Sequence, residues 1–155
     1  MNIEILAVGT RSPAWVADGY DEYQKRLPRD WKLSVQEINV SKRHKGEPAH
    51  KHREAEGTKM LSLIKKDSCI VAMDSRGQNW TTETLALNLN DWSTRFSQVQ
   101  ILIGGPDGLS DECLKRANAS WSLSKLTFPH FLVRVLLAEQ IYRAWSILNK
   151  HPYHK

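Results

Sequence analysis

The sequence has little cysteine and no long apolar run near its start. Its 155 residues include only two cysteines, Cys69 and Cys113, and neither has a partner at the spacing of a zinc site or a redox pair. The apolar stretch Ile5–Val8 is too short for the hydrophobic region of a signal peptide, and no basic side chain precedes it. We therefore expect a cytoplasmic protein in which both cysteines are packing thiols.

Membrane spans, metal sites and nucleotide motifs are also missing. Residues 131–148 are strongly apolar, but Arg134, Glu139 and Arg143 interrupt them, so a membrane span is not expected. The histidines near the C-terminus lack a cysteine or carboxylate at a recognisable ligand spacing, so no metal is expected. The turn after the first apolar run lacks the three glycines of a dinucleotide fingerprint, and no P-loop is present. Chemistry on ATP or GTP therefore has no support.

The composition is that of one folded domain spanning residues 1–155. Apolar residues make up 41% of the chain and charged residues 25%, which is typical of a globular protein. Short apolar runs alternate with helix-like stretches, which predicts an α/β fold with a mostly parallel sheet flanked by helices. The expected strands are Ile3–Gly9, 33–40, Ser68–Asp74, Val99–Ile103 and Trp121–Leu123. The expected helices are Ala14–Leu27, Ala55–Lys66, Thr81–Phe96, Asp111–Ala117 and Phe131–Leu148.

Helix ends and one helix surface add detail to this prediction. Ser12, followed by Pro13, is expected to cap the first helix, and Ser110 is expected to cap the fourth. The final helix, Phe131–Leu148, is apolar on almost every side and needs more cover than one sheet face provides. A second subunit would supply that cover. The other possibility is a central core helix packed within the monomer.

Positive charge is concentrated in one segment. Residues 41–66 contain eight Lys or Arg and three Glu, so this segment accounts for the entire net charge of +5. The segment begins with a polar stretch around Lys42, Arg43 and Lys45, which could hold RNA phosphates beside a catalytic pocket. The alternative is a solvated helix face next to a surface loop. The concentration of the whole surplus here favours RNA binding.

Three short stretches contain most of the residues that suggest a function: Ile103–Ser110, Leu123–His130 and His151–Lys155. The first reads Ile-Gly-Gly-Pro-Asp-Gly-Leu-Ser and lies between an expected strand and an expected helix, where open parallel sheets bind ligands. Its glycines let the backbone approach a ligand closely, and Pro106 stiffens the turn. Such a turn can equally be a plain connection between a strand and a helix.

At these residues the chain resembles the SPOUT-class RNA methyltransferases, and among them the bacterial enzymes that methylate N3 of a pseudouridine in the ribosomal large subunit. The matching segments are, in order, Leu6–Thr10, Glu22–Arg26, the Gly-Gly-Pro-Asp-Gly loop, Leu126–His130, Arg143–Trp145 and Tyr153–His154. Each is short, but their order and spacing along the whole chain make the match specific. The resemblance implies a trefoil knot in the C-terminal part of the sheet, a homodimer with each site near the interface, and S-adenosylmethionine as methyl donor.

The resemblance also implies which residues contact the donor. They are Met73, Gly104, Leu123, Ser124, Lys125, Leu126, Thr127 and Phe128. S-adenosylmethionine needs backbone groups for its adenine edge, an apolar slot for the ring and room for a sulfonium. Glycine-rich loops bordered by apolar side chains could provide these. Met73 departs from the leucine expected of the family, but either side chain fills an apolar slot.

Methyl transfer to an imide nitrogen requires positioning and loss of the ring proton. His130 and His154 are candidates to assist proton loss because imidazole titrates near neutral pH. His130 could instead cap a helix, and His154 could lie in a frayed tail. Arg143 could bind the target or pair with Glu139 four residues earlier, and Tyr153 could stack on a base or pack at an interface.

Two functions follow from these observations. The favoured one is methylation of N3 of a pseudouridine in 23S rRNA, within the assembled ribosome as in the family, with Arg134 of the final helix as a further RNA contact. The chain has no separate RNA-binding domain, so the ribosome and the basic segment would have to supply affinity. The alternative is a non-catalytic flavodoxin-like or RNA-binding module whose glycine loop is structural.

Overall fold

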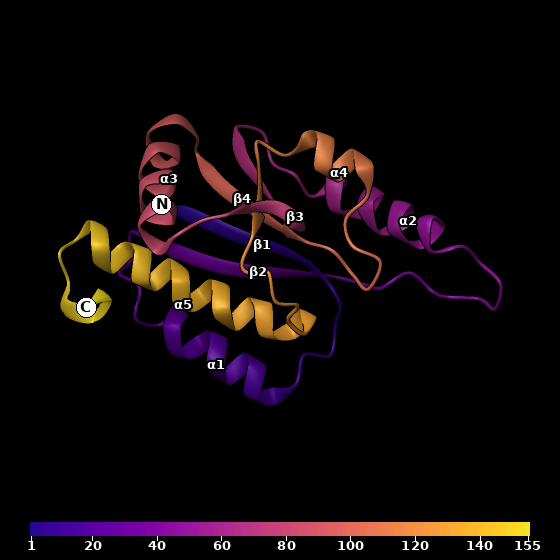
Figure 1. Cartoon of the computed structure of the whole chain (residues 1–155), viewed down its shortest axis with the longest axis horizontal. Helices are drawn as coiled ribbons and strands as arrows, with labels where there is room; N and C mark the ends of the chain where they lie inside the picture. Colours follow the sequence, from indigo (N-terminus) through magenta and orange to yellow (C-terminus); the bar gives the residue numbers. More distant parts are fainter.

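A five-stranded sheet with the order β2-β1-β4-β3-β5 forms the centre of the computed structural model, which describes residues 1–155 (Figure 1). Every neighbouring pair of strands is parallel, so the expected α/β fold with a parallel sheet is confirmed. The strands are β1 (Asn2–Val8), β2 (Lys32–Ile38), β3 (Ser68–Asn79), β4 (Gln98–Ile103) and β5 (Ala119–Ser122). The helices are α1 (Ala14–Gln24), α2 (Ala49–Ser62), α3 (Thr82–Arg95), α4 (Asp111–Arg116) and α5 (His130–Leu148), followed by a 3-10 turn, η1 (Pro152–His154). The trefoil knot implied by the resemblance stays a prediction.

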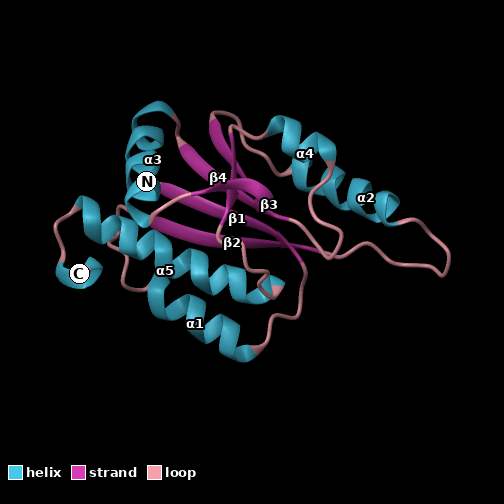
Figure 2. Ribbon diagram, viewed as in Figure 1, coloured by secondary structure: helices cyan, strands magenta, loops and turns pink.

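Helices cover both faces of the sheet, and each face has its own apolar core (Figure 2). Successive side chains of a strand point to opposite faces, so Ile5 and Ala7 enter the core under α1, α3 and α5. Leu6 and Val8 enter the core under α2 and α4. Because both faces are covered, the central strands are apolar nearly throughout, which is why they could be recognised in the sequence.

The start of α2 differs most from the expected boundaries. The helix begins at Ala49 rather than Ala55, and Pro48 precedes it at the N-cap position. Its first turns bury His52 and Glu56 instead of apolar side chains. A helix whose inward positions are polar has no apolar periodicity, so the pattern could not reveal it.

One of the two expected helix caps is wrong. Helix α1 begins at Ala14 with Pro13 as its N-cap, so Ser12 lies one residue too early for its hydroxyl to reach the first free amides. The Oγ of Ser12 has no hydrogen-bond partner. The Ser110 cap is confirmed, because its Oγ accepts a hydrogen bond from the amide of Cys113 at 3.2 Å.

Strand β3 continues beyond the expected end at Asp74 to Asn79. Its pairing with β5 shifts between Met73 and Gln78, which both lie opposite Trp121, so the strand bulges at the edge of the sheet. The bulge leaves Met73 at the end of the regular ladder. Met73 therefore borders the cavity at the carboxyl ends of the strands.

Helix α5 is apolar on several sides but is not fully buried. Its inner surface packs against α1 and α3, and Gly19 lets α1 approach Val135 closely. Other apolar side chains of α5 remain half-exposed: Phe131, Leu132, Val133, Leu136 and Trp145. The packing within one protomer therefore leaves part of the apolar surface of α5 uncovered.

The structure contains no candidate membrane-spanning helix, since none combines the necessary length with enough apolar residues. It also contains no group of three or more His, Cys, Asp or Glu side chains that could hold a metal ion.

The contact between α2 and α4 gives a test of this packing. A Cβ on Gly57 would lie 2.7 Å from the Cβ of Ser110 and closer still to its Oγ. Gly57→Ala should improve helix propensity by about 1 kcal/mol but cost about 1–3 kcal/mol in overpacking, so a lower free energy of unfolding in urea is expected. In a Ser110→Gly background the clash is gone, and the same substitution should stabilise the protein. An equal loss in both backgrounds would contradict this account.

Candidate active site

An open cavity of about 260 Å³ lies at the carboxyl ends of β3, β4 and β5. Because these strands are parallel, their ends meet at one edge of the sheet, where ligands bind in open α/β folds. We call this cavity the donor pocket. The structure brings all eight predicted donor contacts to its lining: Met73, Gly104, Leu123, Ser124, Lys125, Leu126, Thr127 and Phe128.

The glycine loop, residues 104–108, forms one wall of the donor pocket and folds back tightly on itself. The amide of Gly108 donates a hydrogen bond to the carbonyl of Gly105 at 3.0 Å, and Gly108 has a φ of +80°. A Cβ on Gly104 would lie 2.6 Å from the carbonyl oxygen of Gly108. The loop can therefore bring bare backbone to the pocket only with glycine at these positions.

The opposite wall, residues 122–128, is shaped by serine side chains. The hydroxyl of Ser122 donates to the carbonyl of Ser124 at 2.9 Å, and the amide of Leu126 donates to the hydroxyl of Ser124 at 3.0 Å. Asn79, at the end of β3, donates to the carbonyl of Ser122 at 3.0 Å. These bonds hold Leu126 with 72% of its surface exposed at the pocket, so an apolar surface is available to a ligand.

His130 begins α5 beside the donor pocket, where the turn after β1 meets the glycine loop. Its Nε2 is buried without a hydrogen-bond partner and would lie 2.7 Å from a Cβ on Gly9. Burial, together with the positive charge of Arg134, lowers the pKa of His130 below its ordinary value. The lowered pKa favours the neutral imidazole at pH 7.

Arg134 lies one helical turn after His130 and is only 3% exposed. One guanidinium nitrogen donates to Glu37 of β2 at 2.6 Å, and another donates to the carbonyl of Gly9 at 2.7 Å. These bonds tie α5 to the ends of β1 and β2. The predicted RNA contact of Arg134 stays a prediction.

The C-terminal tail packs on α5 of its own protomer. Arg143 pairs with Glu139 at 2.6 Å, which confirms the alternative considered for this residue, and the hydroxyl of Tyr153 donates to the same carboxylate at 3.0 Å. Burial and the bond to Glu139 raise the pKa of Tyr153 to about 12. His154 lies 2.6 Å from the carbonyl of His151 through its Nδ1, so the tail is ordered by contacts of its own.

The four predicted catalytic residues do not meet within one protomer. Arg143, Tyr153 and His154 gather near the end of α5, whereas His130 lies at its beginning (Figure 1). With a rise of 1.5 Å per residue, about 20 Å of helix separates His130 from Arg143. Their chemical roles therefore stay predictions that require a second protomer.

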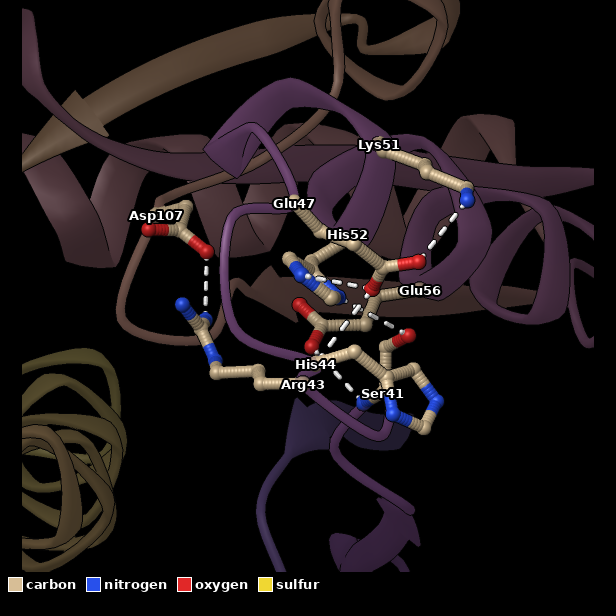
Figure 3. Close-up of polar contacts among 8 residues, drawn as sticks. All are labelled: Ser41, Arg43, His44, Glu47, Lys51, His52, Glu56 and Asp107. Carbon is tan, nitrogen blue, oxygen red and sulfur yellow. Dashed lines mark hydrogen bonds and ion pairs between the residues drawn. The ribbon is translucent and has the colours of Figure 1, made fainter.

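The basic loop, residues 39–48, connects β2 to α2 and reaches the glycine loop (Figure 3). Lys42, Arg43 and Lys45 are exposed, and Arg43 forms an ion pair with Asp107 of the glycine loop. The bond to Asp107, with smaller contributions from the charges of Asp107 and Glu56, raises the pKa of Arg43. The basic loop therefore contacts the glycine loop through Arg43, and its binding of RNA stays a prediction.

Sequence reasoning missed two buried polar residues of this region, His52 and Glu56, which are 3% and 1% exposed. His52 lies in the turns of α2 that precede the expected helix start at Ala55, whereas Glu56 lies inside the expected helix, where no inward role was assigned to it. Their spacing of four residues puts them on one helix face, and this is the only signal that could have identified them.

A larger cavity of about 690 Å³ lies between α1 and β2. It is lined by Arg134 and by the carboxylates of Asp21 and Glu37, and no glycine contributes to it. The glycine loop and the residues predicted to contact the donor border the smaller cavity and none of them borders the larger one.

Known proteins resemble this chain along its whole length. The sequence model described as "Predicted SPOUT methyltransferase" matches residues 1–154. The protein named Ribosomal RNA large subunit methyltransferase H from Nitrosococcus oceani is 50% identical over 155 residues, which cover 100% of this chain and 99% of the relative. Proteins of the same name from Thioalkalivibrio sulfidiphilus and Marinomonas sp. are 49% and 47% identical over all 155 residues, covering 99% and 100% of those relatives. This chain belongs to the SPOUT methyltransferase family.

Proposed function

We propose that this protein transfers a methyl group from S-adenosylmethionine to N3 of a pseudouridine in 23S rRNA, within the assembled ribosome. The observation that supports this most is the donor pocket, whose lining contains all eight residues expected to contact the donor. Relatives of nearly equal length are named as methyltransferases of large-subunit ribosomal RNA. The cytoplasm is the corresponding location.

The residues of the donor pocket fit S-adenosylmethionine. Backbone groups of the glycine loop face one side, and Leu126 and Phe128 offer apolar surface on the other. When bound, the donor would supply a methyl group on a positively charged sulfonium. The protein would hold the reacting nitrogen in line with that methyl group and exclude water around it.

The neutral imidazole of His130 is suited to receive the N3 proton. The residue lines the donor pocket at the start of α5, beside Gly104 of the glycine loop. A base with a lowered pKa remains unprotonated at physiological pH. Proton loss from the imide would then leave the nitrogen lone pair free to attack the methyl group.

A homodimer would complete the site. The half-exposed apolar side chains of α5 provide the surface for a second copy, and burying them is favourable. In a two-fold dimer with antiparallel α5 helices, the tail of one protomer would approach the donor pocket of the other. Arg143, Tyr153 and His154 would then act on a target held beside the partner's donor.

The non-catalytic flavodoxin-like or RNA-binding module is the weaker candidate. It would leave the exposed Leu126 and the neutral His130 in the pocket lining without a role. It also conflicts with the membership of the chain in a methyltransferase family.

The proposal predicts methyl transfer by the purified protein. With labelled S-adenosylmethionine, intact ribosomes should become methylated more than free large subunits or naked rRNA, and nucleoside mass analysis should identify a methylpseudouridine. Methylation of a different nucleoside would keep the enzyme but reject the target. Saturable donor binding without transfer to any of the three substrates would reject the target class.

The donor pocket gives a second prediction. Leu126→Ala should remove apolar contact worth about 1–2 kcal/mol and weaken donor binding by roughly tenfold, measured by calorimetry. Because Leu126 is 72% exposed, the free energy of unfolding should hardly change. Leu87→Ala is the matched control, since Leu87 is 67% exposed on α3 and lies outside the pocket. Equal effects of both substitutions would remove the donor from this cavity.

The composite site predicts complementation between inactive variants. Leu126→Asp should block the donor pocket, and His154→Ala should disable the tail. If each tail serves the partner's pocket, co-expressed variants that mix randomly should recover about a quarter of wild-type activity, because half of the dimers contain one whole site. No recovery from a mixed dimer confirmed by mass would show that each tail serves its own protomer.

A further inference from the structure

The basic loop and the glycine loop are joined by a network of polar contacts around the start of α2 (Figure 3). One connection is the ion pair between Arg43 and Asp107. The other runs through the buried carboxylate of Glu56, which lies between the two loops. The network therefore links the loop expected to bind RNA with the loop expected to bind the methyl donor.

Glu56 contacts both loops directly. Its Oε1 accepts a hydrogen bond from the amide of Ser41 in the basic loop at 2.9 Å. Its Oε2 would lie 2.8 Å from a Cβ on Gly105, so the carboxylate packs against the bare backbone of the glycine loop. Any side chain at position 105 would disturb this contact.

The arrangement is not the one that stability alone would favour. Glu56 is 1% exposed, and its Oε2 has no hydrogen-bond partner. A buried polar atom without a partner lowers stability, and such atoms in native proteins often belong to functional sites. A neutral side chain of similar size could fill the same space at lower cost.

Further contacts hold the rest of the basic loop. Glu47, near its end, pairs with Lys51 at 2.8 Å and lies 3.4 Å from the Nε2 of His52. The Nδ1 of His52 lies 3.3 Å from the hydroxyl of Ser41. The beginning and the end of the loop are thus fixed on α2, while Lys42 and Lys45 remain exposed between them.

We propose that Glu56 and the Arg43–Asp107 pair are positioning residues that couple RNA binding by the basic loop to methyl-donor binding at the glycine loop. Donor binding orders the glycine loop, and this fixes Gly105 and Asp107, which in turn order Ser41 and Arg43. RNA then binds a loop that has already lost conformational freedom, so each ligand raises the affinity of the other by the same factor. In this proposal Arg43 is a link between the loops, and Lys42 and Lys45 meet the phosphates. The inference rests on the proposed function, because it takes the two ligands from it.

The coupling can be measured with intact ribosomes and S-adenosylhomocysteine, which would occupy the donor pocket without reacting. For the wild type, S-adenosylhomocysteine should raise the affinity for ribosomes at fixed salt by about fivefold or more. Asp107→Asn should bring the ratio of the affinities measured with and without S-adenosylhomocysteine close to one. Each ligand alone should still bind this variant within about twofold of wild type, because the lost ion pair is partly exposed. Glu56→Gln, which keeps the shape of the side chain, should also lower the ratio.

Asp91→Asn is the matched control. It removes another aspartate–arginine pair, the one between Asp91 and Arg95 on α3, and should leave the ratio unchanged. A wild-type ratio near one, or an unchanged ratio in Asp107→Asn, would overturn the inference. If Glu56→Gln fails to fold, Asp107→Asn alone decides the question.

A second readout needs no RNA. Donor binding should slow amide hydrogen exchange over residues 39–48 in the wild type and in Asp91→Asn, but not in Asp107→Asn. Unchanged exchange in the wild type, despite saturable donor binding, would reject the coupling while leaving the proposed function intact. Failure of the wild type to bind the donor at all would reject both.

Discussion

The close folding of the glycine loop is the constraint on which the rest of the site depends. Gly104 approaches the backbone of Gly108 so closely that no Cβ fits between them, and a Cβ on Gly105 would lie 2.8 Å from the carboxylate of Glu56. One side of the loop therefore presents backbone to the donor pocket, and the other side receives a buried carboxylate. With a donor in the pocket, the loop would be packed on both sides and could not move on one side without disturbing the other. This gives the coupling between the two proposed ligands a structural basis.

Much of the donor pocket could be predicted because its location follows from general rules. Parallel strands end at one edge, and the apolar runs before Met73, Gly104 and Leu123 indicated which segments meet there, although β3 continues to Asn79, beyond its expected end at Asp74. The polar contacts of α2 could not be predicted in this way. Glu56 is buried against backbone, and neither its charge nor its spacing reveals a partner 49 residues later at Gly105. The Ser12 cap failed for a local reason, since a one-residue shift of a helix start removes a cap.

The positions of the predicted catalytic residues show a different limit of sequence reasoning. His130 and Arg143 both lie on α5, about 20 Å apart, and the expected helix Phe131–Leu148 already implied this separation; the pattern did not show how residues so far apart could meet. Arg143 and Tyr153 are instead joined to Glu139, which forms an ordered tail far from the donor pocket of the same protomer. In the proposed dimer, the ordered polar tail at one end of α5 and the neutral histidine at the other end would form a single site across two copies. The half-exposed apolar surface of α5 is consistent with that arrangement.

Charge explains why coupling would be useful to so small a protein. The basic loop supplies three of the predicted RNA contacts, but Arg43 is paired with Asp107, which leaves Lys42 and Lys45 as the exposed cations of this group. Two phosphate contacts provide weak, salt-sensitive and sequence-independent binding. A loop that is already ordered loses less conformational entropy on binding, so the affinity rises without any additional positive charge. Additional charge would also strengthen binding to unrelated RNA. Binding would then be strongest when the donor is present, which is the state in which methyl transfer can occur.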